Sequence, residues 1–175
     1  MSGRAMIVAI NRSRALIRSG KAKEALTILN DLRDQYPDNA RVLLEMAFLH
    51  DNFGREATAI PLYEKSLRLG TLSKHQRRDA LICLGSSYGT VGNPRRAKSR
   101  LRAAVAENPR DCVAELFLAL VLIDMNDYQR AVTVLAEALL RETRSKLKGY
   151  APVLERKYRA LKRERAKTST RSPKF

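Results

Sequence analysis

Side chains that could carry out chemistry are few in this sequence and lie far apart along it. The two histidines are His50 and His75, and the two cysteines are Cys83 and Cys112. Neither pair has the short, regular spacing of a metal site. We therefore expect no metal and no cofactor, and both cysteines should be reduced thiols in an apolar core.

The segment Gly85-Ser86-Ser87-Tyr88-Gly89 has the glycine and serine order of a hydrolase nucleophile motif. In a hydrolase, the serine of that motif lies between a strand and a helix. Here the segment lies within a helical pattern, and no cluster of bases or nucleophiles accompanies it. We therefore expect that the protein is not an enzyme.

Positive charge is the most prominent chemical feature of the chain. The formal net charge is +16, from 34 basic and 18 acidic residues. Residues 141–175 hold 13 of the basic residues and 3 of the acidic ones, and a second basic group follows Gly92. The candidate basic patch consists of Arg95, Arg96, Lys98, Arg100, Arg102, Arg156, Lys157, Lys162, Arg163 and Arg165.

Such a patch creates a positive field that attracts anionic partners. Nucleic acid is one candidate, because Lys and Arg side chains that neutralise phosphates release counterions. Aromatic residues make up only 6% of the chain, and no recognised nucleic-acid motif is present, so we expect weak binding without sequence readout. An acidic protein partner and a simply solvated basic surface are the alternatives.

The composition favours helices around an ordinary core. Hydrophobic residues make up 45% of the chain, and there are only 8 Gly, 6 Pro and no Trp. The apolar run at residues 6–10 ends at Asn11 and Arg12, so it is too short for an export signal or a membrane span. We therefore expect a cytoplasmic protein.

An internal repeat organises the chain. Four segments share the order apolar helix, Gly or Asn, a few polar residues, Ala, and a second apolar helix. Two sets of residues recur after 34, 38 and 34 residues: Gly20, Gly54, Gly92 and Asn126, and the alanines Ala25, Ala59, Ala97 and Ala131.

Each recurring residue type has a physical role. Gly or Asn supplies the left-handed conformation that ends one helix and reverses the chain. Pro37 and Pro109 stop the second helices of two repeats. Small residues let the paired helices approach closely; on the first helices these are Ser13, Ala47, Gly85 and Ala119.

This pattern resembles the tetratricopeptide repeat. The resemblance rests on the 34-residue period, the Gly and Ala spacing, Leu84-Gly85 followed by Tyr88, and Pro109. From Gly54 to Pro109 the chain is also similar to a small bacterial subgroup called group 5. The resemblance implies an all-α fold, a right-handed α-solenoid of about four helix-turn-helix repeats at about residues 6–39, 40–73, 74–111 and 112–143.

The chain departs from the family pattern at three places, one of which is His50, where the family usually has an aromatic residue or Leu. Arg12 and Ser13 stand where the family prefers Leu and Gly, so the first repeat is expected to be a frayed cap. The interval between the second and third repeats is 4 residues longer than the others. Ser73 and Gln76 form a capping-box pattern there, which predicts a helix over residues 74–90.

The repeat pattern ends after Thr143. Gly149 and Pro152 predict a break and then a capping helix over about residues 150–166, because the last repeat of an array otherwise exposes an apolar face. The repeats and this helix would form one domain, residues 1–167, followed by a disordered basic tail, residues 168–175. The apolar stripe of the capping helix is Tyr150, Leu154, Tyr158 and Leu161.

The geometry implied by the resemblance places the first helices along a concave face. The predicted partner groove on that face consists of Ile10, Arg14, Ile17, Leu44, Phe48, Asn52, Ile82, Ser86, Leu116, Leu120 and Ile123. Most of these residues are apolar, which favours an amphipathic helix or an extended apolar peptide as ligand.

We therefore predict a scaffold that binds a protein or peptide of unknown identity. The groove could instead hold the capping helix or a second copy of the chain, as in a homodimer, and a basic nucleic-acid-associated protein is the alternative function. Chaperone-binding members of the family grip a C-terminal carboxylate, but at the matching positions only Arg14 could serve, while Glu45 and Asp79 would repel it. No such clamp is predicted.

Overall fold

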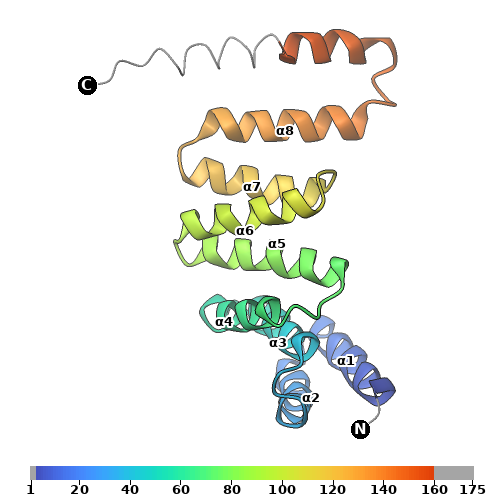
Figure 1. The fold of residues 1–175 in the computed structure, drawn as a ribbon, viewed down its shortest axis with the longest axis vertical. Helices are drawn as coiled ribbons and strands as arrows, with labels where there is room; N and C mark the ends of the chain where they lie inside the picture. Colours follow the sequence, from blue (N-terminus) through green and yellow to red (C-terminus); the bar gives the residue numbers. More distant parts are fainter. Residues whose placement is uncertain (1–2, 160–175) are drawn as a thin grey trace, which may run out of the picture.

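The computed structural model describes residues 3–159, which form helices joined by short turns (Figure 1). A 3-10 turn at Lys148–Tyr150 leads into a helical stretch over residues 151–159, and no strand occurs among the described residues. The preceding helices are α1 (Gly3–Arg18), α2 (Ala22–Gln35), α3 (Ala40–Asn52), α4 (Glu56–Arg68), α5 (Lys74–Thr90), α6 (Pro94–Glu107), α7 (Cys112–Asp124) and α8 (Tyr128–Thr143).

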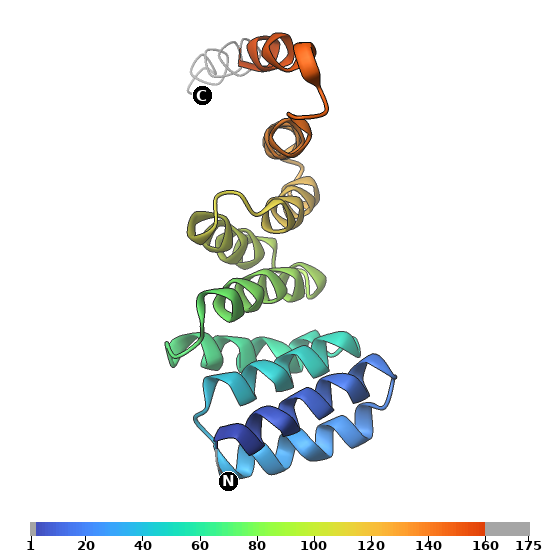
Figure 2. The same cartoon turned by 90° about the vertical axis from the view of Figure 1, so that its right-hand side faces the viewer.

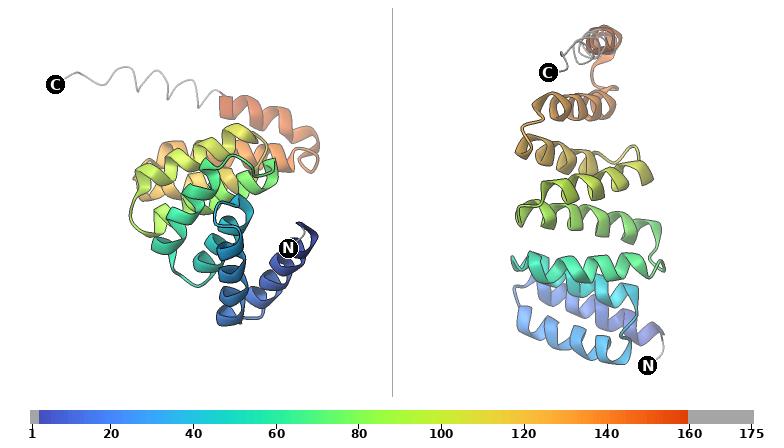
Figure 3. Two further views of the ribbon diagram at one scale, coloured as in Figure 1. Left: turned by 60° about the horizontal axis from the view of Figure 1, so that its bottom comes forward. Right: turned by 60° about the vertical axis from the view of Figure 1, so that its left-hand side comes forward.

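The helices pair, and the pairs stack along one axis. Each pair contacts the next, because α2 packs on α3, α4 on α5, and α6 on α7. Figures 2 and 3 show the first pair at one end of the stack and residues 151–159 at the other. The predicted all-α, right-handed α-solenoid is confirmed.

One residue with a positive φ sets the turn within each pair. Gly20, Gly54 and Gly92 have φ values of 75°, 66° and 76°, and Asn126 has a φ of 57°. Side chains with a Cβ disfavour this conformation, and Asn is among the residues that tolerate it best. The prediction that these residues reverse the chain is therefore confirmed.

The extra residues between α4 and α5 lead into a capped helix. The Ser73 hydroxyl accepts a hydrogen bond from the Gln76 backbone N–H at 3.2 Å, and the Gln76 Oε1 accepts one from the Ser73 N–H at 3.0 Å. This reciprocal pair satisfies two donors that the helix itself leaves free. Helix α5 accordingly spans Lys74–Thr90, as predicted.

Small residues bring the paired helices together. The four recurring alanines of the second helices are all buried. In the third pair, Leu101 of α6 packs directly against the backbone of α5 at Gly85. A Cβ added to Gly85 would lie only 2.5 Å from Leu101 Cγ, so this contact depends on glycine.

The end of the chain is only partly described. Residues 151–159 contact α8 through a hydrogen bond in which Tyr158 Oη donates to the Thr133 carbonyl oxygen at 3.3 Å. The rest of the predicted capping helix, including Leu161, and the predicted tail at residues 168–175 lie outside the described residues. Whether a capping helix reaches residue 166 stays a prediction.

Adding a methyl group at Gly85 should destabilise the fold. In Gly85→Ala the new Cβ meets Leu101 Cγ, a branching carbon that can move only with the whole side chain. Overpacking of this kind costs about 1–3 kcal/mol. Urea unfolding followed by circular dichroism measures the free energy of unfolding.

The matched control for this change is Gly89→Ala, one turn later in α5. Its added Cβ meets Val121 Cγ2 at an ordinary 3.8 Å, so the variant should gain about 0.5–1 kcal/mol from the helix propensity of alanine. A Gly85→Ala variant as stable as Gly89→Ala would contradict the close contact between α5 and α6.

Candidate functional site

The first helices of the pairs contact one another in succession, α1 with α3, α3 with α5, and α5 with α7. We call the surface that they form the concave face. One repeat position on these helices is at least partly exposed in all four: Arg14, Phe48, Ser86 and Leu120. The repeat position one turn later is also at least partly exposed in all four helices. It includes the predicted groove residues Ile17 and Ile123.

A groove of about 510 Å³ lies in the N-terminal half of the concave face. Ile17, Leu44 and Phe48 supply its apolar lining. Its polar lining comes from three helices and is larger than the sequence predicted: Arg14, Arg18, Arg41, Glu45, Asn52, Ser73, His75, Gln76 and Asp79. This half of the face is therefore mixed in character, and the expectation of a mostly apolar groove is wrong for it.

Three of the predicted groove residues belong to the core. Ile10, Leu44 and Ile82 occupy one repeat position and are buried, although the edge of Leu44 borders the groove. They are buried because each first helix packs against the first helix of the next pair. For Ile10 and Ile82 the assignment as groove contacts was wrong, since apolar residues that stack repeats look the same in sequence as those that bind a ligand.

In the last repeat, the repeat position of Ile10, Leu44 and Ile82 is exposed to solvent. Leu116 is exposed because no first helix of a following pair lies against it among the described residues. Helix α7 therefore presents an apolar row, which we call the α7 row: Val113, Leu116, Leu120 and Ile123.

Arg14, one of the polar residues of the predicted groove, is already paired. Arg14 donates from Nε to Glu45 Oε2 at 2.7 Å and from Nη2 to Glu45 Oε1. The Glu45 side chain is only 1% exposed, and its hydrogen bond raises the pKa of Arg14. Arg14 therefore satisfies a buried carboxylate of α3. The absence of a carboxylate clamp stays a prediction.

A second buried ion pair joins α5 to α7. Arg78 donates from Nη2 to Asp111 Oδ1 at 2.8 Å and from Nε to Asp111 Oδ2. Asp111 also caps α7, accepting from the backbone N–H of Val113 at 3.1 Å. These interactions, chiefly the hydrogen bond from Arg78, hold the pKa of Asp111 below its usual value. Sequence reasoning missed this pair, because the partners are 33 residues apart.

A buried polar cluster joins α3, α4 and α5. Tyr63 Oη donates to Asp51 Oδ2 at 3.1 Å, and Ser87 Oγ lies 2.8 Å from Asp51 Oδ1. Burial raises the pKa of Asp51 and raises that of the nearby Cys83 thiol to about 12. A thiol with so high a pKa is unreactive at neutral pH. This cluster therefore acts as a structural link between α3, α4 and α5.

The remaining reactive side chains are separate. Cys112, expected in the core, is exposed at the first residue of α7, and both cysteines are free thiols. His75 pairs with Asp79 at 3.0 Å, whereas His50 is partly buried and its pKa is lowered by that burial. Within residues 3–159, no group of three or more His, Cys, Asp or Glu is arranged to hold a metal ion.

The predicted basic patch divides into two sets on α6. Arg96 lies over the Tyr88 ring, 5.5 Å from its centre, and Arg100 pairs with Glu64 at 3.7 Å. By contrast, no acidic partner lies against Arg95, Lys98 or Arg102 in the described part of the chain. Elsewhere in the patch, the structure leaves Arg156 and Lys157 exposed; outside the described residues lie Lys162, Arg163 and Arg165.

Comparisons with known proteins bear on the whole fold. A family model described as Tetratrico peptide repeat matches residues 40–154, and one described as Tetratricopeptide repeat matches residues 11–39. No curated protein matches the chain in sequence. Over the described residues, no helix is long and apolar enough to cross a membrane.

Solved structures of similar fold include MamA and YrrB. One structure of MamA is 19% identical to this chain, and the match covers 99% of both chains with a TM-score of 0.66. Another structure of MamA is 18% identical, and that match covers 83% of this chain and 82% of the other with a TM-score of 0.69. YrrB, described as a TPR protein with an unusual peptide-binding site, is 19% identical over 74% of this chain and 66% of its own, with a TM-score of 0.63. At these identities the similarity shows the fold alone.

Replacing Asp111 by Asn should lower the free energy of unfolding by about 2 kcal/mol near pH 7, because the hydrogen bonds from Arg78 lose their charged acceptor. Arg78 lowers the pKa of Asp111 in the folded state below about 3.9, the value for an unfolded chain. The stabilisation is therefore present above about pH 4 and is lost as the pH falls through the folded pKa.

The difference between wild type and Asp111→Asn should accordingly shrink on acidification, as measured by urea unfolding at a series of pH values. Asp127→Asn is the control, because Asp127 also caps its helix, α8, but its one ion pair among residues 3–159 is with the exposed Arg130. That change should cost less than about 0.5 kcal/mol. A difference for Asp111→Asn that stays constant with pH would contradict the assignment.

Proposed function

The chain belongs to the tetratricopeptide repeat family, and from that premise we propose that it is a scaffold that binds a helical or extended segment of a partner protein on its concave face. The proposed scaffold carries out no reaction, as is general in the family. The cytoplasmic location expected from the sequence stays a prediction.

The α7 row is the observation that carries this proposal. Leu120 and Ile123 occupy repeat positions that remain at least partly exposed in every pair, so stacking does not account for their exposure. A contiguous apolar row on a soluble repeat protein favours a binding role. Each square ångström that a ligand covers there contributes about 25 cal/mol.

The groove beside Phe48 supplies polar contacts for the same ligand. Arg18 has no ion pair among the described residues, and Arg41 has a buried Nε atom without a hydrogen-bond partner there. A buried donor without a partner is unfavourable until an acceptor reaches it. A bound segment could accept a hydrogen bond from Arg41 in the N-terminal half of the concave face and cover the α7 row with apolar side chains in the C-terminal half.

Leu120→Glu should abolish capture of the partner. It places a charge in the middle of the α7 row without touching the core, because the side chain is exposed. Retention of proteins from cell lysate on the immobilised chain, quantified by mass spectrometry after nuclease treatment, should fall by at least about tenfold, equivalent to 1.4 kcal/mol.

Val91→Glu provides the control, because Val91 is an exposed apolar residue at the end of α5, outside the α7 row. It should retain the same proteins as the wild type. If Leu120→Glu and Val91→Glu retain the same proteins in the same amounts, the concave face is not the binding surface.

Weak binding of a polyanion such as nucleic acid is a second candidate function. It is favoured by Arg95, Lys98 and Arg102, whose charges have no acidic partner in the described part of the chain. Their spacing of three and four residues places them on one side of α6. Arg95 lies in the first turn, where the helix dipole disfavours a positive charge, so its presence is not explained by helix stability.

Changing these three residues together to Gln should weaken binding to single-stranded RNA and reduce its dependence on salt. Three phosphate contacts correspond to a slope of about 2 in a plot of log affinity against log salt concentration. The control changes Arg4, Arg18 and Lys23 to Gln, which removes the same charge from the first pair. Equal losses in the two triple variants would mean that net charge, and not α6, governs binding.

A further inference from the structure

The N-terminal end of the solenoid exposes a face that every later repeat buries. Val8 of α1 is 63% exposed, whereas its counterparts 34, 72 and 106 residues later are 0% exposed: Val42, Ala80 and Ala114. Arg12 is likewise exposed where the later repeats have buried apolar residues: Met46, Leu84 and Leu118.

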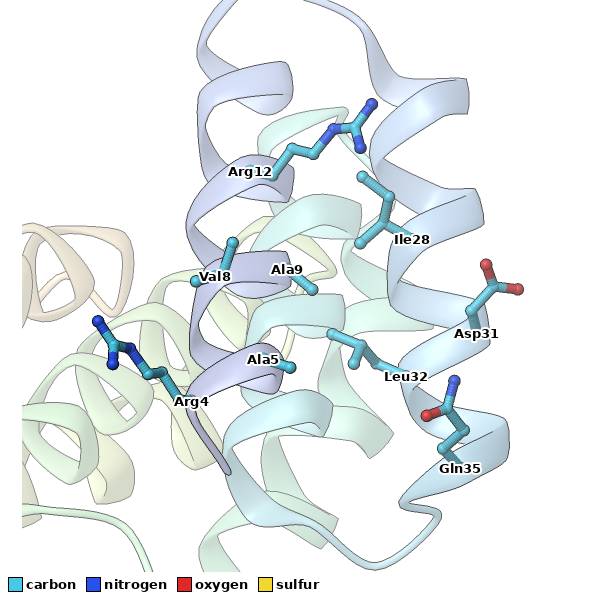
Figure 4. A pocket seen from close by; sticks show the side chains of 9 residues that line it. All are labelled: Arg4, Ala5, Val8, Ala9, Arg12, Ile28, Asp31, Leu32 and Gln35. Carbon is cyan, nitrogen blue, oxygen red and sulfur yellow. The ribbon is translucent and has the colours of Figure 1, made fainter. Parts of the chain in front are cut away.

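A cavity of about 620 Å³ lies on this face between α1 and α2 (Figure 4). In the figure, Ala5, Ala9 and Leu32 point into the space between the two helices, and Arg12 lies across one end of it. Ile28 lines the same space from α2. We call this cavity together with Val8 the N-terminal end face.

The C-terminal end exposes the opposite face of the stack. Leu135 of α8 is 37% exposed, whereas its counterparts Leu29, Tyr63 and Leu101 are 0% exposed. Leu139 is 63% exposed, and Leu116 of α7 is open at the position where the earlier repeats are buried. Residues 151–159 contact α8 at Thr133 and the residue that follows α8, Arg144, and leave these leucines exposed. Leu116, Leu135 and Leu139 form the C-terminal end face.

Inside the chain, these two kinds of face pack against each other. Leu29 and Leu32 of α2 form one apolar cluster with Val42 and Met46 of α3. Leu135 holds the repeat position of Leu29, and Val8 holds that of Val42. The two ends of the solenoid are therefore the two halves of an interface that the chain makes within itself at each junction between repeats.

We propose that a second copy of this chain covers each end, with the N-terminal end face of one copy docked on the C-terminal end face of the next. Such an interface joins two different surfaces, so it leaves one free end of each kind and can extend beyond a dimer. Leu116 belongs to both the α7 row and the C-terminal end face. Leu120, by contrast, holds a position that stays partly exposed between stacked repeats, so a change at Leu120 tests partner binding without blocking end-to-end docking.

Charge affects the end-to-end association of two copies in two ways. Glu142 of α8 holds the repeat position of Tyr36, which packs against the first junction, so Glu142 of one copy would approach Arg12 of the next. The net charge of +16 on each copy opposes association, and salt screens this repulsion. Self-association should therefore strengthen as salt is added, whereas bridging by a bound polyanion would weaken.

Analytical ultracentrifugation of the full chain, free of nucleic acid, tests the proposal. Over about two decades of concentration, the weight-average mass should rise above the 19.8 kDa of the monomer, and more steeply at higher salt. Val8→Glu and Leu139→Glu should each remain at the monomer mass. Both changed residues are exposed, so circular dichroism should show unchanged helicity, and Val91→Glu should associate like the wild type.

Mixing the two blocked variants separates head-to-tail docking from other arrangements. Val8→Glu retains an intact C-terminal end face and Leu139→Glu an intact N-terminal one, so an equal mixture should recover a dimer and nothing larger. A wild type that stays monomeric, an effect of only one of the two variants, or a mixture that stays monomeric would each overturn the proposal. Leu120→Glu should self-associate normally, which keeps this result separate from the test of partner binding.

Discussion

The stacking of one helix pair on the next is the interaction on which the rest of this structure depends. A pair of amphipathic helices cannot bury its apolar side alone, so each pair uses its neighbour as the other half of its core. Leu29, Tyr63 and Leu101 occupy the same repeat position and are fully buried for this reason. The stability of the fold and the choice of exposed residues both follow from the packing of each pair on the next.

The same constraint decides which residues are available to a partner. Along the first helices, the repeat position of Ile10, Leu44 and Ile82 is buried where one pair stacks on the next. The position one turn later stays at the surface, as at Phe48 and Leu120. Within residues 3–159, exposed stacking positions such as Val8 and Leu116 lie at the two ends of the array. Surface binding and end-to-end association therefore use different repeat positions, and Leu116 is common to both surfaces.

Buried charges fix the relation between successive first helices. Glu45 forms an ion pair with Arg14 that joins α3 to α1, and Asp111 forms one with Arg78 that joins α7 to α5. Apolar packing alone tolerates small shifts of one helix along another, whereas a two-pronged ion pair is satisfied in one arrangement only. These pairs occupy cations that would otherwise be free on the concave face, which explains why a basic chain offers few unpaired charges there.

Local signals in the sequence were sufficient for the architecture. The φ values of Gly20 and Asn126, the capping box at Ser73 and the span of α5 each depend on a few neighbouring residues, so the sequence alone determined them. The division of the apolar residues between core and surface was different, because Ile10 and Leu116 share a repeat position and only the presence or absence of a following helix separates them. The ion-pair partners of Arg14 and Arg78 could not be identified from the sequence either, since each lies about thirty residues away along the chain. Tertiary structure decided these features because they depend on which helices lie side by side, a property of the whole stack and not of any single segment.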